Sequence, residues 1–281
     1  MLTAFLRLAS PTRLARTALV GGTALALAYT PMAAQAKELD VPYVPTPPEV
    51  VARMLDMAQV APSDYVIDLG SGDGRIAIAA VRDRSAKGAL GVDIDPARIA
   101  EAEANAKQAG VSDKVQFRNQ DLFDTDLSQA SVITMYLLPD VNMLLRPRLL
   151  DMPPGTRVVS HAFDMDDWDG DEVAHMGQRV VYLWIVPAKV GGSWRLEHQG
   201  QGSAAGPWTV DFQQSFQRLA GTARAADGST LPVQGRLRGA DISFTIGEGE
   251  KARRYTGRVD GQAMKPVPGD GTVQGWRAAR R

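Results

Sequence analysis

The sequence predicts an α/β protein: a doubly wound, mostly parallel sheet followed by a small antiparallel β meander or barrel. Three observations predict this. Between residues 41 and 190, short apolar runs alternate with longer segments of helical periodicity. A glycine-rich loop at residues 68–75 follows the first of these runs. Beyond Gly191 and Gly192, apolar and polar residues alternate with the two-residue period of strands, most clearly over residues 241–246.

The first helix is expected after a proline-stiffened, extended segment at residues 41–48. Thr46 as N-cap, Pro47 in the first turn and Glu49 three residues later indicate a capping box. Apolar residues at helical spacing then extend the helix to Val60.

The remaining elements of this half follow in alternation. Further strands are expected at 65–69, 89–93, 115–119, 131–136, 157–161 and 180–186, and helices at 75–84, 96–110 and 141–150. Asp95 is expected to cap the helix that begins at Pro96, and Gly110 to end it. Continuous apolar strands separated by helices indicate a parallel sheet with helices on both faces.

The C-terminal part has the pattern of short antiparallel strands. Runs of the two-residue period recur at 208–212, 216–223, 231–237 and 255–259, separated by turn signals such as Asp227-Gly228 and Asp260-Gly261. The expected organisation is therefore an α/β domain over residues 37–190 and a β-rich domain over 191–281.

Charge and composition exclude several classes of site. The net charge of −1 provides no overall attraction to nucleic acid. Residues 40–189 are nevertheless acidic, with 23 acidic against 14 basic side chains, and the remainder has the opposite balance. The chain has no cysteine, which rules out a thiolate nucleophile, a disulfide and a cysteine zinc site. No other metal site is predicted.

The first 36 residues resemble a secretory signal peptide. Arg7, Arg13 and Arg16 precede an apolar run at residues 17–28, and Ala34-Gln35-Ala36 supplies a cleavage site. The apolar run is shorter than the roughly 20 apolar residues that a transmembrane helix needs. We therefore expect export to the periplasm, with no stable membrane span after cleavage. The acid-free, arginine-rich start leaves organelle targeting as the alternative.

The glycine loop, Asp68-Leu69-Gly70-Ser71-Gly72-Asp73-Gly74-Arg75, is the strongest functional signal. It joins a strand to a helix, at the edge where open α/β sheets bind ligands. Asp68 and Asp73 distinguish it from a dinucleotide loop, because their carboxylates would repel a pyrophosphate. They suit a cationic ligand such as S-adenosylmethionine, which carries an ammonium and a sulfonium and no phosphate. An NAD-linked oxidoreductase is disfavoured on the same ground.

Two further signals follow on successive strands. Asp93 ends the second strand, about twenty residues beyond the loop, where a carboxylate can accept both ribose hydroxyls. Asp121 and Leu122 follow the third strand and suit the amino group and the ring of adenine. Each alone is typical of a strand-end turn, but their order on three strands predicts a nucleoside site.

Together these motifs resemble the class I S-adenosylmethionine-dependent methyltransferases. Residues 44–168 resemble the family that contains the ATP synthase c-subunit lysine methyltransferases, through the segments DLGSGDGRI, GVDIDP, NQDLFD, MYLLP and PGTRVVSHAFDM. The resemblance implies S-adenosyl-L-methionine as cofactor. It implies that Asp68, Gly70 and Gly72 line its methionine part, Asp93 the ribose, and Asp121 with Leu122 the adenine.

The acceptor side carries weaker signals. The fourth strand ends in Tyr136-Leu137-Leu138-Pro139, not the Asn/Asp-Pro-Pro-aromatic segment typical of enzymes that methylate planar amino groups. Tyr136 is a candidate for lining the transfer site and His161 for accepting a proton. A buried tyrosine and a satisfied core histidine are the alternative interpretations. Acidic residues around Trp168 suit either attraction of a cationic substrate or a solvated loop (Asp164, Asp166, Asp167, Asp169 and Asp171).

The function expected is N-methylation of a lysine-like amine on a protein substrate, with no nucleic-acid partner. The alternative is an exported, non-catalytic nucleoside-binding module that keeps the methyltransferase fold. It is motivated by the signal peptide, since no source of the cofactor is evident outside the cytoplasm.

Overall fold

A computed structural model of the chain describes residues 43–198, 206–269 and 271–281. The expected signal peptide, residues 1–36, lies outside the described residues. No helix in the described part of the chain is both long and apolar enough to cross a membrane.

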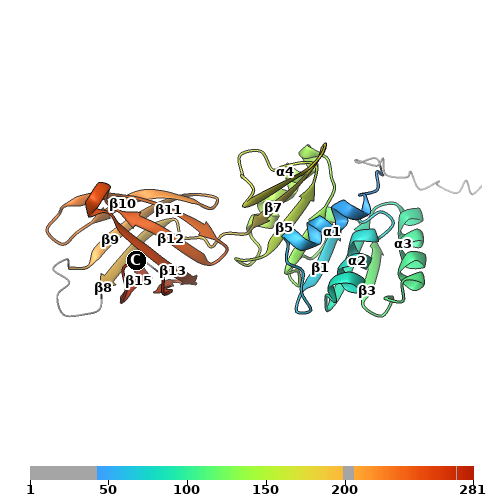
Figure 1. Ribbon diagram of the computed structural model, residues 1–281, viewed down its shortest axis with the longest axis horizontal. Helices are drawn as coiled ribbons and strands as arrows, with labels where there is room; N and C mark the ends of the chain where they lie inside the picture. The colour runs from blue at the N-terminus through green and yellow to red at the C-terminus, as the bar shows by residue number, and fades with distance from the viewer. Residues whose placement is uncertain (1–42, 199–205, 270) are drawn as a thin grey trace, which may run out of the picture. The chain divides into compact units, whose positions relative to one another are not determined.

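The α/β part is built on a seven-stranded sheet with the order β3-β2-β1-β4-β5-β7-β6 (Figure 1). The first five strands pair in parallel, and β7 and β6 add to the edge in antiparallel fashion. The strands are β1 (Tyr65–Leu69), β2 (Gly88–Asp93), β3 (Val115–Asn119), β4 (Val132–Met135), β5 (Arg157–His161), β6 (Glu172–Met176) and β7 (Arg179–Ile185). The α-helices are α1 (Pro48–Met57), α2 (Arg75–Arg84), α3 (Pro96–Gln108) and α4 (Pro139–Leu150).

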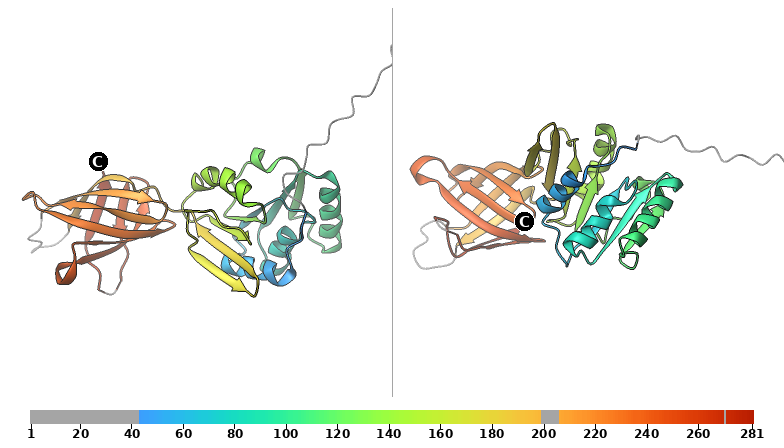
Figure 2. Two further views of the ribbon diagram at one scale, coloured as in Figure 1. Left: turned by 90° about the horizontal axis from the view of Figure 1, so that it is seen from above. Right: turned by 45° about the vertical axis from the view of Figure 1, so that its right-hand side comes forward.

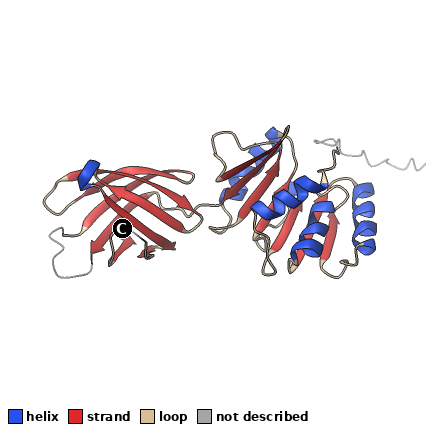
Figure 3. Ribbon diagram, viewed as in Figure 1, coloured by secondary structure: helices blue, strands red, loops and turns tan. Residues whose placement is uncertain are grey.

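Helices cover both faces of this sheet, as the alternating pattern predicts (Figure 3). Alternate residues of each strand belong to different cores. Val66 and Val132 pack with the buried residues of α1 and α2, whereas Ile67 and Ile133 pack with those of α4. The doubly wound, mostly parallel sheet is thereby confirmed. The antiparallel edge strand β6 was not expected, because only its central residue Ala174 is buried.

Local capping rules succeed at one helix and fail at another. Asp95 caps α3 as predicted, accepting a hydrogen bond from the backbone N–H of Ala97 at 2.8 Å. The capping box expected at the first helix is wrong: Pro47 is its N-cap, and no described side chain caps it. The hydroxyl of Thr46 instead lies 3.3 Å from Nδ1 of His161, at the end of β5. A tertiary contact has replaced the local one.

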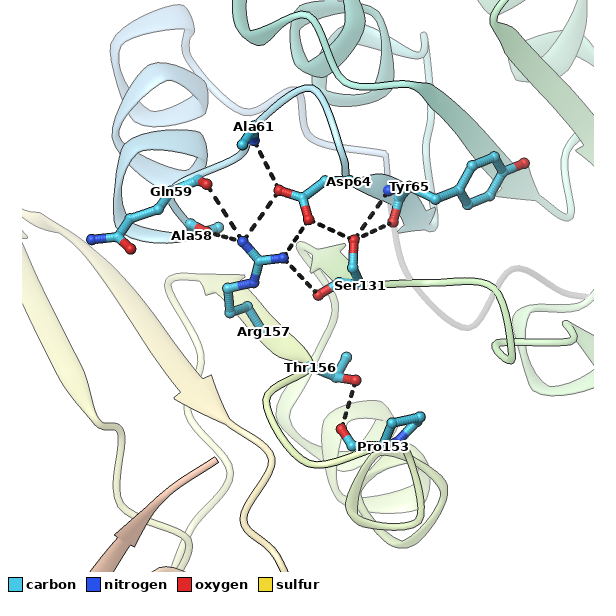
Figure 4. A network of polar contacts seen from close by, with 9 residues as sticks. All are labelled: Ala58, Gln59, Ala61, Asp64, Tyr65, Ser131, Pro153, Thr156 and Arg157. Atoms are coloured by element: carbon cyan, nitrogen blue, oxygen red, sulfur yellow. Dashed lines mark hydrogen bonds and ion pairs between the residues drawn. The ribbon is translucent and has the colours of Figure 1, made fainter. Parts of the chain in front are cut away.

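A polar network ties the amino ends of β1, β4 and β5 together (Figure 4). Asp64, 4% exposed, precedes β1 and forms an ion pair with Arg157 at the start of β5. The hydroxyl of Ser131, before β4, donates to Asp64 at 2.8 Å and accepts from the backbone N–H of Tyr65 at 3.1 Å. Arg157 also donates to the carbonyl of Ala58 behind α1, at 2.9 Å. The network fixes the sheet at the edge opposite the glycine loop.

The C-terminal part is a closed antiparallel barrel of eight strands (Figure 2). They are β8 (Gly192–His198), β9 (Trp208–Ser215), β10 (Arg218–Arg224), β11 (Thr230–Arg238), β12 (Asp241–Ile246), β13 (Arg253–Asp260), β14 (Ala263–Pro266) and β15 (Trp276–Arg280). Inward-facing apolar and aromatic side chains form its core. The small antiparallel barrel is confirmed, although β8, β14 and β15 were not expected. Pairing of β15 with β8 joins its two ends.

Candidate functional site

The glycine loop lies where β1 ends and α2 begins, at the carboxyl edge of the sheet. The backbone N–H groups of Gly70 and Ser71 both donate to the carbonyl of Val92 at 2.9 Å, which ties the loop to β2. Gly74, the N-cap of α2, has φ +79°, a conformation that costs a glycine little. A Cβ there would lie 2.4 Å from Cζ of Phe117, so the loop also needs glycine for close packing.

A cleft of about 970 Å³, its open mouth included, lies beside this loop. Five of the residues singled out in the sequence line it: Gly70, Asp93, Asp121, Leu122 and Tyr136. The other lining residues come mainly from the segment before α1, from the ends of β2 and β3, and from α2, α3 and α4 (Tyr43, Val44, Pro45, Thr46, Asp73, Arg75, Ile76, Val92, Ile94, Asp95, Arg98, Gln120, Phe123, Leu137 and Val141). Asp68, Gly72 and His161 are not among the residues that line the cleft.

Asp93 holds the site together through its carboxylate. One oxygen, Oδ2, accepts from the backbone N–H of Gly72 at 2.8 Å, and Oδ1 accepts from that of Asp95 at 2.9 Å. The same side chain therefore joins the glycine loop, the end of β2 and the start of α3. Each carboxylate oxygen has a second lone pair that these bonds leave available.

Asp68 is the most strongly perturbed carboxylate at the site. It is 1% exposed; Oδ1 accepts from the hydroxyl of Thr134 at 2.7 Å, and the buried Oδ2 has no partner among the described residues. Burial, together with the charges of Asp93 and Asp73, raises the pKa of Asp68 to about 7. The buried Oγ of Ser71, three residues later, also lacks a partner in the described part of the chain. Unsatisfied buried oxygens beside a cleft are expected where a polar ligand completes the structure.

Asp73 requires a correction to the electrostatic argument made from the sequence. It is not a free carboxylate, because the guanidinium of Arg75 donates to both of its oxygens, with Nε at 2.9 and 3.1 Å. Burial alone would raise the pKa of Asp73, but the hydrogen bonds and charge of Arg75 hold it below its ordinary value. Arg75 also donates to the carbonyl of Thr46 at 2.9 Å. Asp73 therefore adds little net negative charge beside the cleft, whereas Asp93 lines the cleft and its carboxylate accepts from backbone N–H groups.

The extended segment before α1 contributes a wall of the cleft that the sequence did not reveal. The ring of Tyr43 lies over Gly72, where a Cβ would be 2.4 Å from its Cε2. The guanidinium of Arg98 lies 4.7 Å from the centre of the same ring, a cation–π contact. Burial, and then the charge of Asp73, raises the pKa of Tyr43. In the sequence, Tyr43 is an aromatic residue within a proline-rich segment. Such a segment has no periodicity from which its position could be predicted.

Aromatic rings gather around Tyr136, which lines the cleft. Tyr136, at the end of β4, contacts His161 with ring centroids 4.0 Å apart and stacks on Phe163 at 6.2 Å. His161 is 4% exposed, and Thr46 lies 3.3 Å from its Nδ1. Burial, and then the charge of Arg179, lowers the pKa of His161, which favours the neutral ring. The structure thus brings both candidate acceptor-side residues together.

Two members of the acidic cluster around Trp168 have structural partners. Asp167 pairs with Arg146, and Asp171 accepts from the backbone N–H of Ile185 at 2.8 Å. Trp168 itself is fully buried. No group of three or more potential ligand side chains in the described residues is arranged to hold a metal ion.

Comparison with known proteins identifies the fold and the chemistry. The ANTKMT methyltransferase domain family matches residues 68–172. A protein-lysine N-methyltransferase of Saccharolobus islandicus (strain REY15A) is 46% identical over 151 residues, which cover 52% of this chain and 94% of that protein. An ATP synthase c-subunit lysine N-methyltransferase of Xenopus laevis is 30% identical over 179 residues, covering 62% of this chain and 78% of that protein.

A solved structure is similar over the same share of the chain. It is an RNA methyltransferase from Salinibacter ruber in complex with S-adenosyl-L-homocysteine, with 50% identity and a TM-score of 0.51, covering 52% of this chain and 96% of that one. The cofactor of this chain is accordingly S-adenosylmethionine, as the acidic glycine loop predicted. The chain belongs to the family of S-adenosylmethionine-dependent methyltransferases that includes the S. islandicus protein-lysine N-methyltransferase and the ATP synthase c-subunit lysine N-methyltransferases.

Proposed function

We propose that this methyltransferase acts on the side-chain amine of lysine in a protein substrate. The observation that carries the proposal is the contact between Tyr136, which lines the cofactor cleft, and His161, a buried histidine with a lowered pKa. A neutral histidine beside the cleft suits an acceptor that must lose a proton. The names of two relatives that this chain covers for most of their length, both lysine N-methyltransferases, support the same acceptor.

The residues around the cleft fit S-adenosylmethionine. A cationic group near the glycine loop would stabilise the charged form of Asp68, whose buried Oδ2 has no partner among the described residues, and this favours the cationic methionine end of the cofactor there. We assign that end to Asp68, Gly70 and Gly72. The available lone pairs of Asp93 are assigned to the ribose hydroxyls, and Asp121 with Leu122 to the adenine. When bound, the cofactor supplies a methyl group already activated on a sulfonium.

The protein orients the acceptor and the cofactor and provides a group that takes up the acceptor's proton. A lysine side chain has an ordinary pKa near ~10.4, so an apolar, desolvated channel must favour its neutral, nucleophilic form. The ring of Tyr136, which lines the cleft and stacks on Phe163, provides part of such a wall. We propose that Nδ1–H of His161 donates to the hydroxyl of Thr46, which leaves Nε2 as the acceptor of the amine's proton. Correct positioning of two reactants can lower a barrier by about 7–11 kcal/mol in favourable cases.

The test is a methyl-transfer assay with methyl-labelled cofactor and extracts from the source cells. Label is expected in protein, as methyllysine identified by mass spectrometry. His161→Asn is expected to lower kcat by at least about a hundredfold, the usual contribution of a general base, with little change in cofactor affinity. His175→Asn is the matched control, because His175 lies exposed on the edge strand β6.

Two outcomes would contradict the proposal. Label that is removed by ribonuclease and not by protease would indicate an RNA acceptor, the substrate class for which the Salinibacter ruber methyltransferase is named. Cofactor binding without transfer to any macromolecule would favour a non-catalytic nucleoside-binding module.

We further propose that the chain is exported after recognition of residues 1–36 as a signal peptide. The basic start, the apolar run and the Ala34-Gln35-Ala36 site support this. Mass spectrometry of the N-terminus after cell fractionation tests it. A mature protein that begins near Lys37 in the periplasmic fraction is expected, whereas an intact N-terminus in the cytoplasmic fraction would contradict export.

A further inference from the structure

The loop that follows β5 carries two residues in a strained backbone conformation. Ala162, directly after His161, has φ +69°, and Asp166 has φ +54°. Neither is glycine, and other residues disfavour this left-handed region. The backbone N–H of Phe163 donates to the carbonyl of His161 at 2.9 Å, so Ala162 is the centre of a γ-turn of the rare, strained form. Such strain persists only where the surrounding structure holds the turn in place.

Helix α4 holds this loop through its backbone carbonyls. Nδ2 of Asn142 donates to the carbonyl of Phe163 at 3.3 Å and to that of Asp164 at 3.1 Å. One turn later in the helix, the guanidinium of Arg146 donates to the carbonyl of Met165 at 3.0 Å. Three successive carbonyls of the loop are therefore held from one helix.

Stability alone does not account for Asn142. The residue is fully buried, and its Oδ1 has no hydrogen-bond partner among the described residues. An unsatisfied buried acceptor destabilises the folded state, whereas leucine has the same branched shape and no polar atom to bury. Unsatisfied polar atoms and strained turns that persist in a folded protein point to a function.

The loop connects Asn142 to the acceptor side of the cleft. The carbonyl of Phe163 that Asn142 holds also accepts from the hydroxyl of Ser160 at 2.7 Å. The ring of Phe163 stacks on that of Tyr136, with centroids 6.2 Å apart, and Tyr136 contacts His161 at 4.0 Å. Tyr136 lines the cleft, whereas Asn142 is not among the lining residues. A change at Asn142 therefore reaches the cleft through Phe163 and Tyr136.

We propose that Asn142 is a positioning residue for methyl transfer: its amide holds the γ-turn at Ala162 and so keeps the ring of Phe163 against Tyr136. The role rests on the proposed assignment of Tyr136 and His161 to the acceptor. The effect of Asn142 on these rings can nevertheless be measured without an acceptor.

The first measurement is NMR titration of the three histidines in the full-length protein with S-adenosylmethionine bound. Burial, and then the charge of Arg179, lowers the pKa of His161 from its ordinary 6.5. Asn142→Leu removes the donor, so the rings beside His161 should loosen and its pKa should rise toward the ordinary value. His175 and His198 are internal controls, and their pKa values should not change.

Ser160→Ala is a second variant, with little change in volume. It removes the other side-chain donor to the carbonyl of Phe163 and should raise the pKa of His161 in the same direction. An unchanged pKa of His161 in both Asn142→Leu and Ser160→Ala would overturn the proposal.

The second measurement is the rate of methyl transfer to proteins of a source-cell extract at saturating cofactor. Asn142→Leu is expected to lower this rate by at least about tenfold, with an unchanged cofactor Kd in calorimetric titration. Asn119→Leu is the matched control, because Nδ2 of Asn119 also donates to two successive carbonyls, those of Asp93 at 3.1 Å and Ile94 at 2.8 Å, on the cofactor side. That variant should weaken cofactor binding. An equal loss of cofactor affinity in both variants would contradict a role on the acceptor side.

Ala162→Gly tests whether strain in the turn is what Asn142 opposes. Glycine adopts positive φ at little cost, so the turn then needs less support. When Ala162→Gly is added to Asn142→Leu, the pKa of His161 and the transfer rate should return toward the wild-type values. Recovery of neither would overturn the proposal. If the wild type itself forms no methyllysine, the proposed acceptor is wrong, and the titration of His161 still decides whether Asn142 holds the turn.

Discussion

Replacement of Asp68 by asparagine should make the cofactor-free protein more stable at alkaline pH while weakening cofactor binding. Asp68 is buried, with a pKa raised to about 7 from an ordinary value of 3.8. For an acid whose folded-state pKa is raised, the unfolded chain releases its proton first. Stability is therefore lost as pH rises from the unfolded value to the folded one. Asparagine has no such titration, and its amide oxygen can still accept from Thr134.

The size of the effect follows from the two pKa values. Between pH 5 and pH 8, release of the Asp68 proton removes about 2–3 kcal/mol of stability, from 1.36 kcal/mol per unit of differential protonation. The new amide N–H₂ has no acceptor among the described residues at the position of Oδ2, which costs about 1–3 kcal/mol at every pH. The packing cost is the same at every pH. The change with pH in the stability difference between the two proteins therefore measures the effect of the Asp68 charge alone.

The assay is urea unfolding of both proteins at pH 5 and pH 8, without cofactor. Relative to the wild type, Asp68→Asn should gain about 2–3 kcal/mol between these pH values. Calorimetric titration at pH 8 should show weaker cofactor binding in the variant. A stability difference that does not change with pH would refute the reasoning, because it would mean that Asp68 has an ordinary pKa in the folded protein.

Three further predictions follow from the fold and the cleft. Asp64→Ala should lower the free energy of unfolding by about 3 kcal/mol, the low end for a broken buried pair because the Arg157 side chain is 21% exposed. Hydrogen bonds and the charge of Arg157 outweigh burial and lower the pKa of Asp64. The part of the stability difference that comes from the carboxylate charge should therefore be lost as pH falls through the folded-state pKa in urea titrations, and a pH-independent difference would contradict this. Tyr43→Ala should raise the cofactor Kd in calorimetric titrations with little change in Tm, since Tyr43 is 42% exposed, and an unchanged Kd would contradict its place in the cleft wall. Gly74→Ala should lower Tm more than Gly110→Ala; both glycines have positive φ, but only at Gly74 would a Cβ meet other atoms, and equal Tm losses would argue against close packing there.

The sheet was predictable because strands that are buried on both faces are continuous runs of apolar residues in the sequence. Continuous apolar runs are clear in β1, β2, β4 and β5. The order of these strands along the chain predicted the edge of the sheet at which Asp93 and Asp121 lie with the glycine loop. Asp95 was predictable for a different reason: its capping bond spans two residues and depends on no distant partner.

Other features depend on partners that the sequence does not bring together. The hydroxyl of Thr46 contacts His161, 115 residues away, in place of its own helix. Closure of the barrel depends on β15 pairing with β8, across most of the C-terminal part. β14 has four residues, too few for its alternation to be distinguished from a loop.

The net charge of the glycine loop depends on a pair of residues that are neighbours in the sequence. Arg75 follows Asp73 by two residues, close enough to neutralise it, and the structure has that pair. The unusual carboxylate is Asp68, and its raised pKa follows from burial, which no local pattern records. The prediction of a cationic ligand was right, although one of the two carboxylates behind it was not free.

The most direct test of the cofactor site is calorimetric titration of the full-length protein with S-adenosylmethionine, in wild type and in Asp93→Ala. Because Asp93 both orders the glycine loop and borders the cleft, saturable binding at one site per chain is expected in the wild type, and a large loss of affinity in the variant. No saturable binding by the wild type, or unchanged affinity in Asp93→Ala, would contradict the assignment of the cleft to the cofactor.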